Sequence, residues 1–106
     1  MDIAFQTRAL RDLCEDELRL SARFGSDAAT QIIARMADLR ATEAIQELVK
    51  AGLCVPLEDG RLASSIDAGW RIVLAPNHLQ RRRASSPPLP WSQVTRVKVL
   101  AIENAT

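Results

Sequence analysis

The sequence has no tyrosine, one histidine and two cysteines among its 106 residues. It lacks any stretch approaching the roughly 20 apolar residues of a membrane-spanning helix, and its first residues lack the basic and apolar segments of a secretion signal. Two cysteines are too few for a disulfide framework. Because Cys14 and Cys54 stand among apolar neighbours, we expect both thiols to lie in the core. We therefore expect a cytoplasmic protein that has no contact with a membrane.

Standard catalytic and metal-binding motifs are also missing. The sequence contains no G-x-x-x-x-G-K-[ST], H-E-x-x-H, C-x-x-C or G-x-S-x-G. The single histidine, His78, stands in a proline-rich stretch with no second histidine or cysteine nearby to share a metal ion. We expect His78 to be a solvent-exposed loop residue, and we expect neither a metal site nor a cofactor.

What the sequence does have is a globular composition with unevenly placed charge. Apolar residues make up 47% of the chain and charged residues 25%, which at this length predicts one domain over residues 1–106 with a small core. Residues 1–50 carry 7 basic and 9 acidic side chains, whereas residues 51–106 carry 7 basic and 4 acidic ones. The net charge of +1 therefore hides a basic second half rich in arginine, the side chain suited to bidentate phosphate contacts.

Helical periodicity dominates the first half. Apolar side chains recur every three or four residues over 7–24, 26–40 and 42–50, and glycines stand where the first and third segments end. The first segment is predicted to be one amphipathic helix, with an apolar face made of Leu10, Leu13, Cys14 and Leu18. The second completes a helical hairpin and is predicted to bury Ala29, Ile32, Ile33, Met36 and Ala37.

From residue 61 onward the pattern changes to the alternation of β-strands. Strands are predicted over 61–66 and 70–75, joined by a turn in which Gly69 takes a positive φ, and a last strand over 94–103. Residues 2–5 indicate a short edge strand, and residues 76–92 a long exposed loop. In the last strand we expect one face to carry Val97, Val99 and Ala101, and the other Arg96, Lys98, Leu100 and Ile102. Helices followed by strands predict an α+β fold in which a helical hairpin packs on a small antiparallel sheet.

The basic residues of the second half are the candidate binding groups. Arg96 and Lys98 share a strand face, and Arg71 joins them if its strand pairs in a suitable register. A further run, Arg81, Arg82 and Arg83, lies in the predicted loop, where nothing apolar fixes its position. Such cations are able to hold RNA phosphates, although strand charges also simply keep an exposed sheet face in water.

Four short segments follow one another in a distinctive order. They read FxTRALRDL at 5–13, ARMADLRA at 34–41, GWRI at 69–72 and WSxVTxVKVLxIE at 91–103. Together they resemble the plasmid-killer or HigB-like toxins of the RelE/ParE superfamily, and the likeness extends over nearly the whole chain. The resemblance implies a RelE-like fold, which is the helical hairpin on an antiparallel sheet expected above.

This resemblance also implies a function. Family members are toxins of type II toxin–antitoxin systems that serve plasmid maintenance and inhibit growth, and HigB-like and RelE-like members are endoribonucleases that cut mRNA on the ribosome. A cognate helix-turn-helix antitoxin holds them inactive and binds the operator DNA. By resemblance, Arg71 contacts the scissile phosphate and Arg61 is a second catalytic arginine, while RNA binding falls to Arg81, Arg82, Arg83, Arg96 and Lys98.

The sequence departs from the family pattern at the groups that transfer protons. Family members commonly end in Asp-Tyr-His, where this chain has Asn104, Ala105 and Thr106, and the family's histidine ahead of the hairpin is missing from 55–61. Arginine stays protonated near neutrality and does not replace these groups. One hypothesis is a toxin that cleaves ribosome-bound mRNA, with His78 or a ribosomal RNA group transferring the proton.

Two other hypotheses remain open. One is a catalytically degenerate or non-enzymatic family member that acts by protein binding, either as an inhibitor of DNA gyrase or on an antitoxin or another partner alone. The other is a small α+β interaction domain unrelated to toxins.

Overall fold

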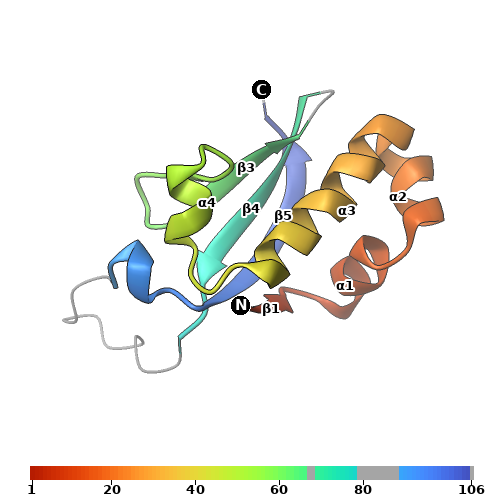
Figure 1. Cartoon of the computed structure of the whole chain (residues 1–106). Coiled ribbons are helices and arrows are strands. Elements are labelled where there is room, and N and C mark those ends of the chain that lie inside the picture. The colour runs from red at the N-terminus through yellow and green to blue at the C-terminus, as the bar shows by residue number, and fades with distance from the viewer. Residues whose placement is uncertain (67–68, 79–88, 106) are drawn as a thin grey trace.

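Helices cover one face of a five-stranded sheet in this protein (Figure 1). A computed structural model describes residues 1–66, 69–78 and 89–105. Its elements, in chain order, are β1 (Asp2–Phe5), α1 (Arg8–Cys14), α2 (Glu17–Phe24), α3 (Ser26–Ala41), α4 (Gln46–Lys50), β2 (Val55–Pro56), β3 (Leu62–Ile66), β4 (Trp70–Pro76), a 3-10 helix (Trp91–Gln93) and β5 (Arg96–Asn104). The predicted α+β class is confirmed.

The sheet is mixed, so the prediction of a wholly antiparallel sheet is wrong. Its strand order is β1-β5-β4-β3-β2, and β1 runs parallel to β5 whereas the other neighbours are antiparallel. The edge strand expected over residues 2–5 is present and places Ile3 opposite Val97. A long connection through the helices separates these two strands in the sequence, and such a connection permits parallel pairing, which a tight hairpin does not.

The first predicted helix is in fact two helices, because the helical conformation is interrupted at Asp16. The Asp16 carboxylate accepts hydrogen bonds from the backbone N–H groups of Leu18 (3.0 Å) and Arg19 (3.2 Å) and thereby caps α2 as a new helix. The break changes the helical phase. Cys14 is buried, whereas Leu18, expected on the same face, is 83% exposed.

Replacing Asp16 by alanine is expected to lower the free energy of unfolding by about 1 kcal/mol, because two N–H groups at the start of α2 lose their acceptor. Asp12→Ala is the matched control, since it removes an exposed carboxylate from α1 and is expected to change stability by less than about 0.5 kcal/mol. Urea unfolding followed by circular dichroism measures both variants. Equal midpoints for the two would contradict the capping role.

The predicted helical hairpin is formed by α2 and α3, which pack side by side with Gly25 between them. Gly25 has a φ of 92°, which glycine adopts without strain and other residues rarely do. Five residues of α3 are buried: Ala28, Ala29, Ile32, Met36 and Leu39. Ile33 and Ala37, predicted to be buried, are exposed instead. The side of α3 that packs against the core is narrower than the range of positions at which the helix has apolar residues.

The third predicted helix is shorter than expected. Regular helix is confined to α4. Thr42, the first residue of the predicted segment, instead ends α3, and its hydroxyl donates to the carbonyl of Leu39 at 3.2 Å. Ile45 and Leu48, two apolar residues of the predicted segment 42–50, are buried. The segment before α4 therefore serves to connect α3 to the core rather than to extend a helix.

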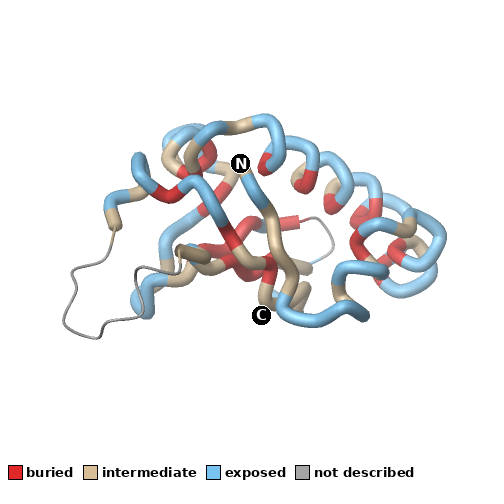
Figure 2. Tube along the Cα trace, turned by 90° about the horizontal axis from the view of Figure 1, so that it is seen from below, coloured by how far each residue is buried: buried red, intermediate tan, exposed pale blue. Residues whose placement is uncertain are grey.

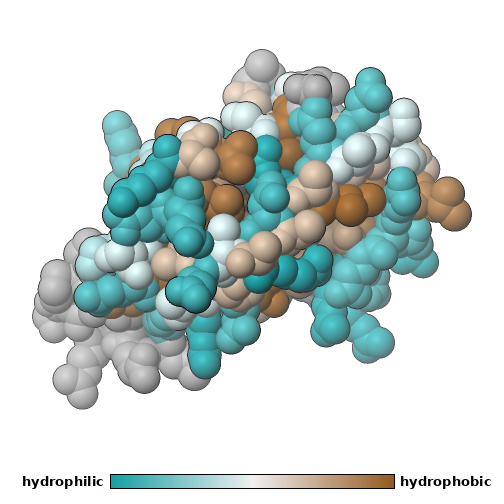
Figure 3. Space-filling view, in the orientation of Figure 1, coloured by the Kyte–Doolittle hydropathy of each residue, from teal (hydrophilic) through white to brown (hydrophobic). Residues whose placement is uncertain are grey.

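The core lies between the helices and the sheet face that they cover (Figure 2). Phe24 and Trp70 join the two layers, since their rings meet edge to face with centroids 4.7 Å apart. On the surface seen in Figure 3, hydrophilic side chains predominate, with smaller hydrophobic patches among them. Residues that are essentially inaccessible include Leu20, Ile32, Met36, Leu39, Ile45, Leu62, Ile72, Leu74, Val94, Val97 and Val99.

One arginine crosses this core from α3 to β3. Nη1 of Arg35 donates to the carbonyl of Leu53 at 2.9 Å and to Oγ of Ser64, and that hydroxyl in turn donates to the same carbonyl at 2.7 Å. Ser64 is fully buried, and the Arg35 side chain is only 14% exposed. Nε of Arg35 makes no hydrogen bond to the described residues and lies 3.7 Å from Oδ2 of Asp38.

A bulge interrupts the pairing of β5 with β4. Leu74 lies opposite Val99, and the preceding Val73 lies opposite Ala101. Leu100 is therefore an extra residue on β5 with no counterpart on β4, and such a residue shifts the alternation of the strand that carries it.

This bulge changes which residues of β5 face the helices. Val97 and Val99 share a face, as predicted, and this face meets the helices. Beyond the bulge Ile102 faces the helices, because it lies opposite the buried Ile72, and Ala101 turns to the other face. The prediction for these last two residues is wrong, since it assumed unbroken alternation.

The predicted loop over 76–92 is described only at its two ends, 76–78 and 89–92. Its C-terminal end contains the 3-10 helix, and Asn77 at its N-terminal end donates to the carbonyl of Arg96 at 2.9 Å. Within the described residues no helix combines the length and the apolar character needed to cross a membrane.

Candidate nucleic-acid interface

Three of the predicted phosphate-binding cations lie on the sheet face that the helices leave uncovered. Residues opposite one another on neighbouring strands share a face. Arg71 is on the same face of β4 as Ala75, which lies opposite Lys98, and Arg96 is two residues from Lys98 on β5. We call this surface, defined by Arg71, Lys98 and Arg96, the open sheet face; no described helix covers it (Figure 2).

These cations form a row rather than a cluster. Lys98 lies opposite Ala75, four residues from Arg71 along β4, and Arg96 lies further in the same direction. At about 3.3 Å per residue, Arg71 and Lys98 are separated by roughly 13 Å along the strand. A row of this kind follows an extended chain of phosphates better than it surrounds a single anion.

Glu103 holds the guanidinium of Arg71. The two residues are cross-strand partners, and Nε and Nη2 of Arg71 donate to Oε1 of Glu103 at 2.9 and 2.6 Å. The side chains are 30% and 42% exposed, so solvent screens the pair and its contribution to stability is small. Nη1 of Arg71 makes no hydrogen bond to the described residues, and it is therefore free to meet an anion.

Sequence reasoning missed Glu103, although it belongs to the last of the four recognised segments. Unbroken alternation from Val97 would have turned Glu103 toward the helices. The extra residue Leu100 turns it to the open sheet face, beside Arg71. No signal in the sequence marks the bulge itself.

The other predicted strand and turn arginines also have carboxylate partners. Arg96 Nε lies 3.5 Å from Oδ2 of Asp2, and Arg61 Nε lies 2.6 Å from Oδ2 of Asp59. The backbone N–H of Arg61, which donates to Oδ1 of Asp59, lowers the pKa of that carboxyl, and its guanidinium adds to the effect. Lys98 forms no ion pair with the part of the chain that the structure describes.

The structure does not bring the two predicted catalytic arginines together. Arg61 precedes β3, at the end where Leu62 lies opposite Leu74, whereas Arg71 lies opposite Ser65 near the other end of that strand. Roughly 13 Å of extended chain therefore separates Arg61 from Ser65, the cross-strand partner of Arg71. The loop arginines Arg81, Arg82 and Arg83 lie outside the described residues.

His78 lies far from Arg71. The backbone N–H of Thr95 donates to Nε2 of His78 at 3.2 Å, which requires a ring whose Nε2 carries no proton. Arg71 is near the opposite end of β4, and the five residues from it to Pro76 span roughly 17 Å. His78 and Arg71 are therefore not placed to act on one phosphate.

The two cysteines are free thiols buried in the core, as expected. Burial raises the pKa of the Cys14 thiol to about 11, and the charge of Glu15 adds to the effect. Burial also raises the pKa of the Cys54 thiol, and the positive charge of nearby Arg35 acts in the opposite direction. Among residues 1–66, 69–78 and 89–105, no group of three His, Cys, Asp or Glu side chains is placed to hold a metal ion.

At pH 8 the Cys14 thiol is expected to react with 5,5′-dithiobis(2-nitrobenzoate) about 100-fold more slowly in the folded protein than in urea. The reason is that a pKa of about 11 instead of 9.0 lowers the thiolate fraction by that factor. Single Cys14→Ser and Cys54→Ser variants assign the signal to each thiol. Rapid modification of Cys14 before unfolding would show that it is accessible and reactive.

Comparison of the chain with protein-family models, with curated proteins and with solved structures finds no match. Function is therefore inferred from the four sequence segments and from the open sheet face.

Proposed function

We propose that this protein is the toxin of a type II toxin–antitoxin system, with a RelE-like fold, and that it cleaves ribosome-bound mRNA with the open sheet face. The observation that carries the proposal is the row of Arg71, Lys98 and Arg96 on the sheet face that no described helix covers. The sequence resemblance supports it, since Arg71 and Lys98 are among the matched residues of the recognised segments. The expected partners are the ribosome with its mRNA and a cognate helix-turn-helix antitoxin, which would bind operator DNA.

Arg71 is the residue that binds the scissile phosphate in this proposal. Its charge is permanent, Glu103 fixes its orientation from one side, and its Nη1 group is available. Such a group stabilises the negative charge that develops on the phosphoryl oxygens as the new bond forms. Lys98 and Arg96 contact the neighbouring phosphates and position the strand without reading its sequence.

Glu103 is the proposed general base. Its carboxylate is 42% exposed and lies beside Arg71, so it is placed to take the proton from the ribose 2′-hydroxyl. The 2′-oxygen then bonds to phosphorus, the bond from phosphorus to the 5′-oxygen breaks, and the products are a 2′,3′-cyclic phosphate and a 5′-hydroxyl. A ribosomal RNA group supplies the proton to the leaving 5′-oxygen, which makes cleavage depend on the ribosome.

A second candidate function is protein binding without catalysis. It is favoured by the carboxylate partners of Arg71, Arg96 and Arg61, which partly neutralise the cations, and by the distance of His78 from Arg71. In that case the protein inhibits growth by binding a target such as DNA gyrase, or it binds an antitoxin or another partner alone.

Inducible expression in bacteria and a reconstituted translation reaction test the proposal together. We expect growth arrest, and cleavage of mRNA that carries ribosomes but not of the same RNA free in solution. A known HigB-like toxin serves as the positive control. Growth arrest with intact mRNA would support the binding function instead, and the absence of both effects would overturn the toxin proposal.

A further inference from the structure

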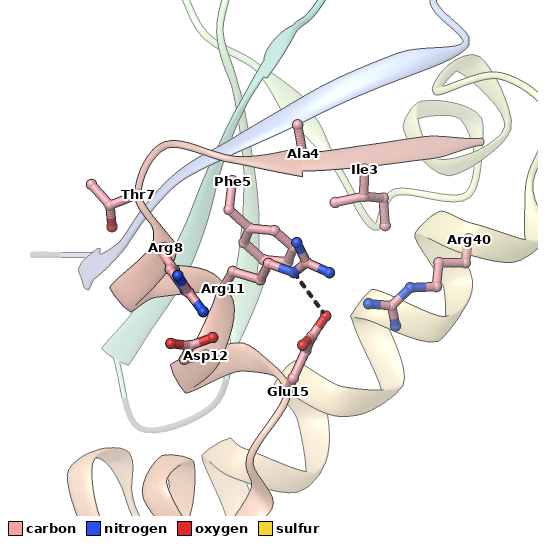
Figure 4. A pocket seen from close by; sticks show the side chains of 9 residues that line it. All are labelled: Ile3, Ala4, Phe5, Thr7, Arg8, Arg11, Asp12, Glu15 and Arg40. Carbon is pink, nitrogen blue, oxygen red and sulfur yellow. Dashed lines mark hydrogen bonds and ion pairs between the residues drawn. The ribbon is translucent and has the colours of Figure 1, made fainter.

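A groove of about 910 Å³ runs along the outer edge of β1 (Figure 4). One wall is β1 itself, and the others come from α1 and from Arg40 near the end of α3. It lies at the edge of the sheet, whereas Arg71 of the open sheet face is on β4, two strands away. We call it the β1-edge groove.

Unpaired backbone groups border this groove. The N–H groups of Asp2 and Gln6 donate to carbonyls on the β5 side, of Thr95 (3.2 Å) and Val99 (2.8 Å). Alternate residues of a strand direct their backbone groups to opposite sides, so Ile3 and Phe5 direct theirs away from β5. Because β1 is the last strand of the sheet on this side, no described strand hydrogen-bonds to them. Such an edge is a template for an additional strand.

The groove is positively charged. Arg8, Arg11 and Arg40 line it together with two carboxylates, Asp12 and Glu15. Arg11 donates to Glu15 at 3.4 Å, whereas Arg8 and Arg40 form no ion pair with residues that the structure describes. Arg8 and Arg40 are therefore available to an anionic ligand towards the two ends of the groove (Figure 4).

We infer that the β1-edge groove binds an extended acidic segment of a partner protein. The segment adds a strand beside β1, its main chain hydrogen-bonds to Ile3 and Phe5, and its carboxylates meet Arg8 and Arg40. A second copy of this chain fits less well, because pairing of β1 with itself brings the same arginines together. A nucleic acid would satisfy the arginines but would leave the strand edge unpaired. This inference does not depend on the proposed function.

Synthetic eight-residue peptides that alternate glutamate with valine or threonine test the inference on the ¹⁵N-labelled protein. Binding is expected to slow hydrogen exchange of the Ile3 and Phe5 amides by at least about tenfold, since these gain hydrogen bonds. The amides of Asp2 and Gln6 are already bonded and should change little. Peptides with glutamine in place of glutamate should bind more weakly, and those with lysine or with N-methylated edge positions should not bind.

Arg8→Gln and Arg40→Gln are each expected to weaken binding of the glutamate peptide about tenfold. Arg19→Gln is the matched control, because this exposed arginine is on α2 outside the groove. Four outcomes would overturn the inference. They are no binding of the glutamate peptide, equal binding of the glutamine peptide, protection of Ile3 and Phe5 by rising protein concentration alone, and displacement of the peptide by a short RNA.

Discussion

Arg71→Ala is expected to abolish growth arrest and to lower ribosome-dependent cleavage by about 10²–10³-fold, because the scissile phosphate loses its charged donor. Arg96→Ala is the matched control. It removes a more exposed arginine from the same face and should weaken cleavage by less than about tenfold. Cleavage of a defined mRNA in a reconstituted translation reaction measures both variants.

The stability of the Arg71→Ala variant must be measured together with its activity. The pair of Arg71 with Glu103 is partly exposed, so its loss should lower the free energy of unfolding by at most about 1 kcal/mol. An inactive Arg71→Ala protein with a nearly unchanged melting temperature would therefore have lost a phosphate contact and kept its fold. Full cleavage by this variant would show that Arg71 does not bind the scissile phosphate.

Glu103→Gln separates the two roles of the carboxylate. Glutamine keeps an oxygen that accepts from Arg71 but is not a base, so cleavage should fall by about 10²-fold while RNA binding is retained. If Glu103 only orients Arg71, this variant should keep most of its activity.

Arg35→Ala is expected to lower the free energy of unfolding by about 3 kcal/mol and the melting temperature by more than about 10 °C. The substitution removes the charged donor to Ser64 and to the Leu53 carbonyl and leaves a cavity between α3 and β3. Arg35→Met keeps more of the volume and should cost less, since the Ser64 hydroxyl still donates to that carbonyl.

The control for Arg35 is another helical arginine with an aspartate three residues away. Arg19 pairs with Asp16, but its side chain is 66% exposed, so Arg19→Ala should cost less than about 0.5 kcal/mol. Thermal and urea unfolding of the variants provide the measurement. Similar losses for Arg35→Ala and Arg19→Ala would mean that the buried contacts add nothing beyond a surface pair.

Local pattern predicted much of this fold. The strand boundaries around Gly69 follow from alternation and from a turn that needs a positive φ, and that glycine has a φ of 80°. The predictions fail where one residue overrides a repeat. Asp16 caps a second helix inside an apolar periodicity, and Leu100 shifts the faces of β5. The parallel pairing of β1 with β5 could not be predicted from local pattern, because it depends on how two segments far apart in the sequence pack together.

The candidate site was also predicted only in part, because local pattern gives the faces of single strands but not the contacts between distant segments. Alternation within one strand is enough to put Lys98 and Arg96 on one face. It does not give the pairing of Arg71 with Glu103, because that pairing depends on the register between strands far apart in the sequence. Nor does it give the contact of His78 with the backbone of Thr95, which lies far along the chain. Arg35 was not singled out, since an arginine in an amphipathic helix is usually a surface residue.

The bulge in β5 has a consequence for how this chain tolerates changes in length. Leu100 has no counterpart on β4, so deleting it removes a residue from the strand without altering the partners of Val99 or Ala101. Deleting an ordinary strand residue, by contrast, turns every side chain on one side of the gap to the opposite face. Leu100 is therefore a position at which a longer and a shorter version of this protein share the same surface, with Glu103 beside Arg71 in both.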